Sequence, residues 1–195
     1  LRLVIHDREG PTTKADCLNR LYEALQSDER RQGFQAKMVV LHDAEDMVDP
    51  HALALLDDAM NEADLVQLPV IPIPQADSRW IAGHYCEEFA EAHGKVMVVR
   101  DALRAAMPLA GVGCAISRQM LHKLCEAKNS DRPFASECLT EDYELGIGLA
   151  DFGAKARFIR MRGQDGELIA TRACFPAALD EAVRQKTRWV HGIAF

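Results

Sequence analysis

The stretch that decides the fold reads Met38-Val39-Val40-Leu41-His42-Asp43-Ala44-Glu45-Asp46. Its first four residues are apolar, which predicts a short buried β-strand. The acidic residues follow at once, so they come at the carboxyl end of that strand. Open α/β sheets bind their ligands at this edge. We therefore expect Asp43, Glu45 and Asp46 to line a functional site.

Carboxylates dominate the sequence around this strand, because residues 38–78 contain many Asp and Glu but no Lys or Arg. Carboxylates held ~4–6 Å apart repel each other, and a bound divalent cation removes that conflict. Oxygen ligands of this kind suit Mg²⁺ or Mn²⁺. The candidate metal ligands are Asp43 with Glu45 or Asp46. The alternative is a solvated acidic turn followed by an acidic helix face.

Short apolar runs alternate with helical patterns on both sides of this stretch, which indicates an α/β layer architecture. We expect strands over residues 3–5, 38–41, 111–116 and 156–161, and an edge or irregular strand over the proline-rich residues 65–73. Helices are expected over residues 18–25 and 80–100, and after Pro50, Ser117, Thr140 and Pro176.

Length and composition fit one folded domain over residues 1–195, with 48% hydrophobic and 27% charged residues. The net charge of -7 argues against a nucleic-acid partner, because a protein that binds nucleic acid usually presents a basic face to the phosphates. The six cysteines form no C-x-x-C pair, so structural zinc is disfavoured and a reducing compartment is indicated. No apolar run reaches the ~18–20 residues of a membrane span.

Two further clusters carry candidate chemistry. Thr140-Glu141-Asp142 comes at a predicted helix start, where a carboxylate could act as a general base or could simply complement the helix dipole. Arg184-Gln185-Lys186-Thr187-Arg188-Trp189 combines cations with an indole. It could clamp a diphosphate and stack on a sugar, or it could be a solvated basic face with one core Trp.

In their order along the chain, these motifs resemble the D-x-D, T-E-D and Q-x-x-R-W series of processive family 2 glycosyltransferases, the group that includes cellulose and hyaluronan synthases. Glu45 replaces the second Asp of D-x-D. Lys14-Ala15-Asp16-Cys17-Leu18-Asn19 resembles the family's K-A-x-x-L-N segment, and Ala110 to Ala115 stands where the family has a small-residue acceptor loop. The resemblance covers nearly the whole chain.

The resemblance implies a GT-A type, Rossmann-like α/β sandwich around a mixed, mostly parallel sheet. It also implies that the family's first two strands, which carry an acidic residue that reads the nucleotide base, are absent from this chain. The implied roles are catalysis by Asp142 and Glu141, nucleotide or diphosphate binding by Lys14, Gln185 and Arg188, acceptor contact by Trp189, Gly113 and Cys114, and Mg²⁺ or Mn²⁺ binding by Asp43 with Glu45 or Asp46.

The implied reaction is inverting, metal-dependent transfer of a sugar from a UDP-sugar to a glycan or another envelope or exopolysaccharide acceptor. The implied location is the cytoplasmic face of the bacterial inner membrane, reached through segments outside this chain. Residues 189–195 would then lie near lipid headgroups, although they could instead pack on the core. Two alternatives remain: a metal-dependent nucleotidyltransferase, and a non-catalytic scaffold or binding module of an envelope complex.

Overall fold

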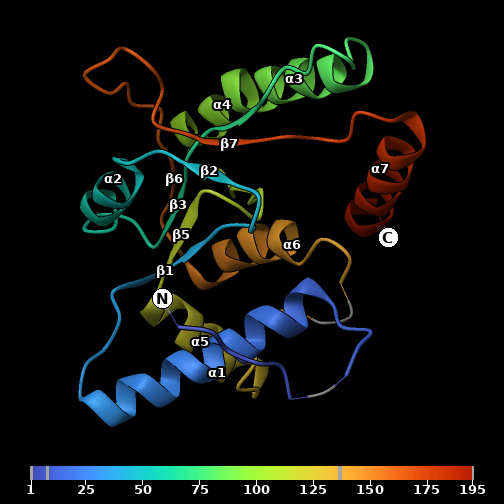
Figure 1. The fold of residues 1–195 in the computed structure, drawn as a ribbon. Helices are drawn as coiled ribbons and strands as arrows, with labels where there is room; N and C mark the ends of the chain where they lie inside the picture. The colour runs from blue at the N-terminus through green and yellow to red at the C-terminus, as the bar shows by residue number, and fades with distance from the viewer. Residues whose placement is uncertain (1, 8, 136–137, 195) are drawn as a thin grey trace.

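The computed structural model describes residues 2–7, 9–135 and 138–194 (Figure 1). Helices and strands alternate along most of the chain, as the sequence pattern predicts. In order they are α1 (Lys14–Gln32), β1 (Met38–Leu41), β2 (Met47–Val48), α2 (Ala52–Ala59), β3 (Leu65–Gln67), β4 (Val70–Pro72), α3 (Ile81–Glu91), the π-helix η1 (Ala92–Val96), α4 (Met97–Ala102), β5 (Cys114–Ser117), α5 (Arg118–Lys128), α6 (Glu141–Gly148), the 3-10 helix η2 (Leu149–Phe152), β6 (Ala156–Phe158), β7 (Thr171–Ala173) and α7 (Leu179–Ala194).

The main sheet has the strand order β1-β5-β3-β6. Strand β5 pairs antiparallel with both β1 and β3, whereas β6 pairs parallel with β3. Strands β1, β3 and β6 therefore point the same way and β5 runs against them. This confirms a mixed sheet in which most strands share one direction, and the α/β fold is consistent with a GT-A type.

A smaller sheet has the order β2-β7-β4, with β7 antiparallel to β2 and parallel to β4. The proline-rich residues 65–73 thus contribute to both sheets. The expectation of an edge or irregular strand is wrong for β3, which is buried inside the main sheet, and right for β4, which pairs only with β7. Pro69, which lacks an N–H donor, falls between the two strands, where pairing changes from one sheet to the other.

Alternate residues of the central strands face different helices, as strand geometry requires. Leu65, Cys114 and Ile116 belong to the core cluster formed with α1, α5 and α6. Val66 and Ala115 belong to the second cluster, formed with α2. Helices α1, α5 and α6 gather below the strands in Figure 1, α3 and α4 lie above them, and α7 stands to one side.

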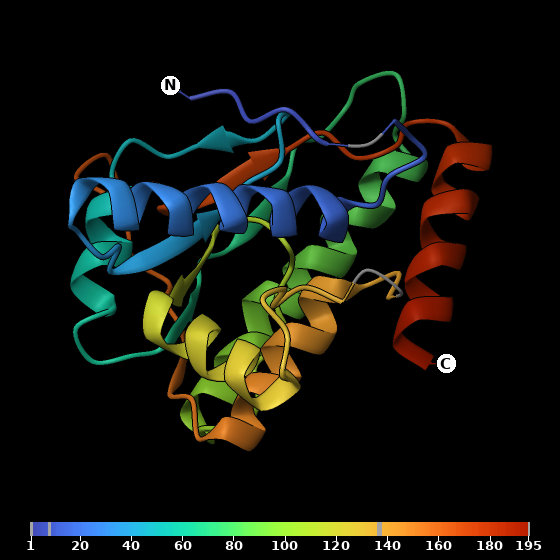
Figure 2. The ribbon, with the colours of Figure 1, turned by 90° about the horizontal axis from the view of Figure 1, so that it is seen from below.

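Helix α1 has clear start and stop signals. Thr13 and Asp16 form a reciprocal capping box, and Gly33 ends the helix at φ 68°. Tyr22 of this helix is buried, whereas its neighbour Leu21 is half exposed. Figure 2 shows α1 running across the molecule, with its first turn toward α7.

One sequence prediction fails at the level of elements. Residues 3–5 form no strand: Leu3 and Ile5 are 84% and 76% exposed, and no described strand pairs with them. The long helix predicted over residues 80–100 is confirmed as a continuous helical run through α3, η1 and α4, with a π-helical turn inside it. The helix expected after Pro176 is also confirmed, and it begins at Leu179. Within the described ranges, no helix is both long and apolar enough to cross a membrane.

Candidate active site

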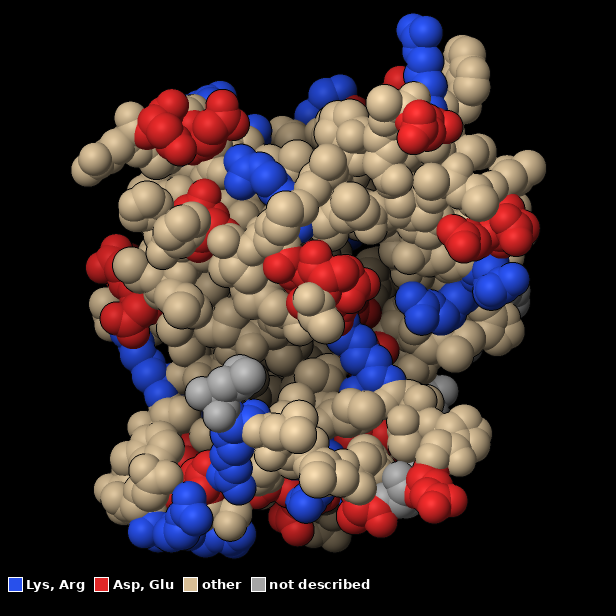
Figure 3. Space-filling view, viewed as in Figure 1, with Lys and Arg blue, Asp and Glu red and all other residues tan. Residues whose placement is uncertain are grey.

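Residues from distant parts of the chain line one pocket of about 160 Å³ at the carboxyl end of β1. The surface is hollowed beside α7 in Figure 3. Of the residues singled out in the sequence, the pocket is lined by Lys14, Asp43, Glu45, Asp46, Glu141, Asp142, Gln185, Arg188 and Trp189. Asp43 and Asp142, which come from distant parts of the chain, therefore face one cleft.

The small-residue loop before β5 forms another wall. Ala110 and Val112 line the pocket, whereas Gly113 and Cys114 are buried and are not among its lining residues. Burial raises the pKa of the Cys114 thiol to about 12, and the nearby charge of Asp142 adds to that rise. The loop therefore reaches the pocket through Ala110 and Val112.

Lys14, the first residue of α1, connects two walls of the pocket. Its Nζ lies 2.6 Å from Asp43 Oδ1 and donates to the Gly111 carbonyl at 3.3 Å. Burial lowers the pKa of Lys14, but the hydrogen bond to Asp43 and its charge outweigh burial and leave that pKa raised. A side chain at Gly111, where φ is 74°, would collide with the Asp142 carboxylate. Gly111 therefore allows the lysine and Asp142 to approach the loop.

Asp142 is an unusual carboxylate because it is largely buried. Burial raises its pKa, and the negative charge of Asp43 adds to the rise. The Tyr143 N–H, which lies 2.8 Å from Asp142 Oδ1, and the charge of Lys14 offset this rise only in part. Burial also raises the pKa of neighbouring Glu141. A carboxyl group with a raised pKa is suited to accept a proton near neutral pH.

The acidic loop after β1 contains carboxylates in two situations. Asp46 Oδ2 accepts from the Asp43 backbone N–H at 2.8 Å and lies 3.2 Å from His42 Nδ1, so Asp46 closes the turn. Asp43 is partly exposed and Glu45 is exposed. Across the described residues, no three His, Cys, Asp or Glu side chains form a group that could hold a metal ion by themselves.

Helix α7 supplies the remaining wall. Gly192 lies against Thr140, and a side chain there would come within 2.7 Å of the Thr140 hydroxyl. Because of this close approach, α7 lies beside the start of α6. Burial raises the pKa of Glu141 there, and the charge of Arg188 offsets part of that rise. Gln185 lines the same pocket, and its buried Oε1 has no hydrogen-bond partner among the residues that the structure describes.

Another cation of this helix, Lys186, has a different role. Lys186 pairs with Glu88 and lies over the Tyr85 and Trp189 rings, at 4.6 and 5.3 Å from their centroids. Trp189 also meets Tyr85 edge to face at 6.2 Å. Lys186 thus fixes α7 to α3, and Arg188 is left to face the pocket.

The apolar residues 189–195 do not pack on the core as a group. Trp189 is partly buried, but Val190 and Ile193 are 62% and 51% exposed. Phe195 lies outside the described residues.

Sequence reasoning missed one part of the site. Phe175 lines the pocket directly after β7 and stacks on Tyr85 with ring centroids 4.9 Å apart. Phe89 lies 4.8 Å from Phe175 and also lines the pocket. The strand-edge rule that selected Asp43 could have selected Phe175, but the short strand Thr171–Ala173 was not recognised. Trp80, which precedes α3, is 84% exposed.

Comparisons with known proteins identify the family of this chain. A family-wide sequence profile described as "Glycosyltransferase like family 2" matches residues 1–192. The chain is 36% identical to "Bacteriophage adsorption protein B" of Escherichia coli strain K12 over 208 aligned positions, which cover 98% of this chain. "Bacteriophage N4 adsorption protein B" of Escherichia coli O157:H7 matches with the same identity and coverage.

The chain spans 28% of the length of each of these curated relatives. The family profile nonetheless matches almost the whole of this chain. The residues that carry the family's motifs line one pocket. The chain therefore belongs to glycosyltransferase family 2.

Proposed function

We propose that this chain transfers a sugar from a UDP-sugar to a hydroxyl group of a glycan or another envelope acceptor, with inversion at the anomeric carbon. The observation that carries the proposal is the convergence of Lys14, Asp43, Asp142 and Arg188 on one pocket. These side chains come from α1, the loop after β1, α6 and α7. A sugar nucleotide needs both a charged clamp and a base, and this pocket contains candidates for both.

In this proposal Asp142 is the general base. Its carboxylate takes the proton of the acceptor hydroxyl, whose oxygen attacks the anomeric carbon from the face opposite the diphosphate. Glu141 borders the same space, and its raised pKa makes it a secondary proton site. Trp189 and Phe175 offer ring surfaces on which a sugar can stack.

Gln185 and Arg188 are proposed to hold the diphosphate, together with Lys14. The Gln185 side-chain N–H groups can donate to phosphate oxygens, and the arginine fork matches those oxygens. These groups stabilise negative charge on the departing nucleoside diphosphate. The acceptor loop then contributes Ala110 and Val112 directly, with Gly113 and Cys114 behind them.

The acidic loop fits a divalent cation that is shared with the donor. Mg²⁺ usually takes one or two carboxylates and completes its coordination with substrate phosphates and water. Asp43 and Glu45 can supply those carboxylates, whereas the Asp46 carboxylate already closes the turn. When bound, Mg²⁺ or Mn²⁺ would neutralise charge on the leaving diphosphate.

The decisive experiment compares Asp142→Asn with the matched variant Asp151→Asn, which changes an exposed aspartate just beyond the same helix. Transfer is measured as nucleotide release from a panel of UDP-hexoses and UDP-N-acetylhexosamines. Asp142→Asn should keep donor binding and lose about 10²–10⁴-fold in turnover, the usual scale of general-base catalysis. Normal turnover in this variant would remove Asp142 as the base. Donor binding without turnover in the wild type would favour a non-catalytic binding module.

We also propose that the protein works at the cytoplasmic face of the bacterial inner membrane, held there by segments outside this chain. Leu179, Val183, Val190 and Ile193 of α7 are all largely exposed, although the helix carries several cations. Apolar residues beside cations suit the headgroup region. Co-sedimentation with anionic vesicles tests this idea: Val190→Ser with Ile193→Ser should reduce binding, and equal binding of both proteins would contradict it.

A further inference from the structure

A second cavity, of about 620 Å³, lies away from the active-site pocket. Leu65 and Ala156, the first residues of β3 and β6, border it, so it lies at the opposite end of these strands from the candidate active site. Its volume falls within the ~300–1,000 Å³ range of small-molecule sites. No residue of the family motifs lines it.

Small side chains form most of its wall and leave room for a ligand. They come from the end of α4 and the loop after it, from α6 and η2, and from β6 and the residues before it. They are Ala102, Ala105, Ala106, Gly146, Ala150, Ala154 and Ala156.

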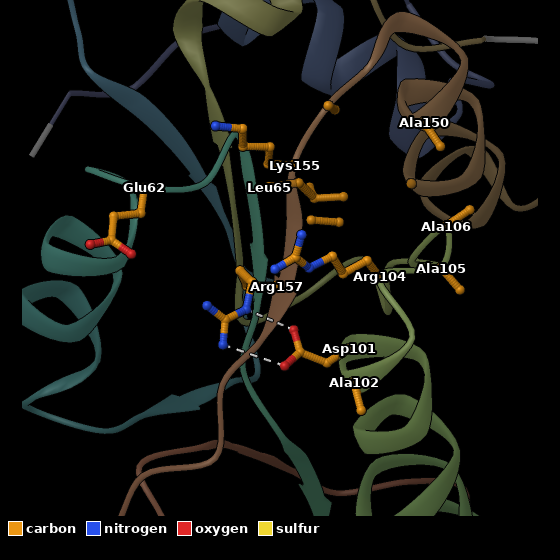
Figure 4. Close-up of a pocket in the computed structure, with 13 residues that line it drawn as sticks. Glu62, Leu65, Asp101, Ala102, Arg104, Ala105, Ala106, Ala150, Lys155 and Arg157 are labelled. Carbon is orange, nitrogen blue, oxygen red and sulfur yellow. Dashed lines mark hydrogen bonds and ion pairs between the residues drawn. The ribbon is translucent and has the colours of Figure 1, made fainter.

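Cations gather at this cavity in a protein whose net charge is -7. Figure 4 shows Arg104 reaching across the cavity toward Arg157 and Lys155. Arg157 is neutralised by Asp101, with nitrogen–oxygen distances of 2.9 and 3.4 Å. Glu62 is the other lining carboxylate, and its charge contributes to the raised pKa of Arg157 after the larger effect of Asp101.

Arg104 and Lys155 are therefore the cations available to a ligand. Among the described residues, neither the Arg104 guanidinium nor the Lys155 ammonium group takes part in a hydrogen bond or ion pair, although the Lys155 backbone N–H donates to the Asp64 carboxylate at 2.9 Å. Both residues are exposed at the mouth of the cavity, one from the loop after α4 and one beside β6. An anion between them would be held from two sides.

The backbone of Arg104 gives independent support. Its φ of 51° is positive, a conformation that glycine adopts without strain and that other residues rarely adopt. The Arg104 N–H donates to the Asp101 carbonyl at 3.0 Å and ends α4, a position where glycine is usual. An arginine held in a strained conformation at a cavity is typical of a functional side chain.

We propose that this cavity binds a small phosphate monoester whose organic part is compact and apolar. Arg104 and Lys155 would hold the phosphate, since two cations match its double charge and the guanidinium fork matches its oxygens. The alanine wall would contact the organic part. This site is separate from the proposed donor site and does not depend on it.

Phenyl phosphate is the probe, because it combines a doubly charged head with a flat apolar group. Binding is followed by amide chemical shifts of the ¹⁵N-labelled chain, which locate the site. We expect saturable shifts at residues 102–106 and 154–157. Benzoate should bind at least 10-fold more weakly, and neutral benzyl alcohol should not bind. Equal binding of benzoate would contradict the assignment to phosphate, and no shift at these residues would contradict the site.

Four variants make the test specific. Arg104→Gly should weaken binding at least 10-fold while the melting temperature stays the same or rises, because glycine relieves the strained φ. Lys155→Ala should also weaken binding, and Lys123→Ala, an exposed lysine on α5, should leave it unchanged. Arg188→Ala removes a cation from the active-site pocket only, so full loss of binding in that variant would place the phosphate there and overturn the proposal.

Discussion

At the scale of single residues, the catalytic role proposed for Asp142 conflicts with the stability of the fold. Burial and the charge of Asp43 raise its pKa above the ordinary value of 3.8. The folded state therefore binds this proton more tightly than the unfolded state. The stability that this bound proton gives to the folded state falls as pH rises from 3.8 through the raised pKa, and the contribution is fully lost above that pKa.

The substitution Asp142→Asn should therefore raise the melting temperature at pH 7, because it removes a charge that is costly to bury. The gain should shrink as the pH falls and vanish below 3.8, where the wild-type carboxyl is neutral in both states. Thermal unfolding at a series of pH values measures this difference. A stabilisation that did not change between pH 3 and pH 8 would rule out the charge as its cause.

The buried side chain of His93 should cause a second pH dependence of stability, opposite in sign to that of Asp142. Its buried Nδ1 accepts the Val70 N–H at 2.9 Å, and burial lowers its pKa from 6.5 to about 4. The unfolded state takes up this proton first, so stability is lost as pH falls from 6.5 to about 4. At about 1.4 kcal/mol per pKa unit, the loss is roughly 3 kcal/mol.

Urea unfolding between pH 4 and pH 7 should show this slope. The variant His93→Gln should be less stable at pH 7, because the packed ring is lost, and should show a weaker pH dependence. His122→Gln is the control, since His122 is exposed on α5. An unchanged slope in His93→Gln would mean that other groups cause the pH dependence.

At the scale of elements, helix α6 depends on one glycine for its position. A Cβ at Gly146 would lie 2.7 Å from the Leu109 backbone nitrogen and would also collide with the Met107 carbonyl. At Gly148, one half-turn further along the same helix, nothing lies within 4 Å of an added Cβ. The same substitution should therefore have opposite effects at the two positions.

We expect Gly146→Ala to destabilise the protein by about 1–3 kcal/mol, because overpacking against backbone forces the helix to move. Gly148→Ala should stabilise it by about 0.5–1 kcal/mol through helix propensity. Chemical denaturation of the two variants measures both effects. Equal effects of one sign would show that α6 does not pack as closely as the structure indicates.

The same scale explains which elements could be predicted from sequence. Helix α1 has a capping box and a terminal glycine, and β1 is an uninterrupted apolar run, so local signals are sufficient for both. Residues 3–5 have the same local pattern as a strand, but a strand also requires a neighbour to pair with. Residues 65–73 divide between two sheets, and only tertiary pairing decides where each part goes.

The site followed a similar rule. The acidic loop, the start of α6 and the polar face of α7 were predictable because their residue types and their order matched a chemical pattern. Phe175 was missed because β7 has three residues and gives no clear strand signal. The hydrogen bond that the Asp46 carboxylate accepts from the Asp43 N–H also could not be predicted from the sequence, because it depends on local backbone geometry.

At the scale of the whole molecule, the candidate active-site pocket is small and is lined by charged side chains. Its volume of about 160 Å³ is smaller than the ~300–1,000 Å³ of most small-molecule sites. Lys14, Gln185 and Arg188 can meet a diphosphate, and the acidic loop can share a cation with it. The pocket's aromatic residues lie toward α3 and β7, where the proposed acceptor and sugar would stack.

The isolated chain should therefore bind UDP weakly and with little selectivity for the base. In the presence of Mn²⁺, calorimetry should give similar affinities for UDP, ADP and pyrophosphate, because the diphosphate supplies most of the contacts. Chelation of the metal should weaken all three, and Asp43→Asn should have the same effect. Arg188→Ala should reduce binding, whereas Lys123→Ala should not. Tight binding of UDP with clear discrimination against ADP would contradict this account, since it would require a base-reading surface within residues 1–195.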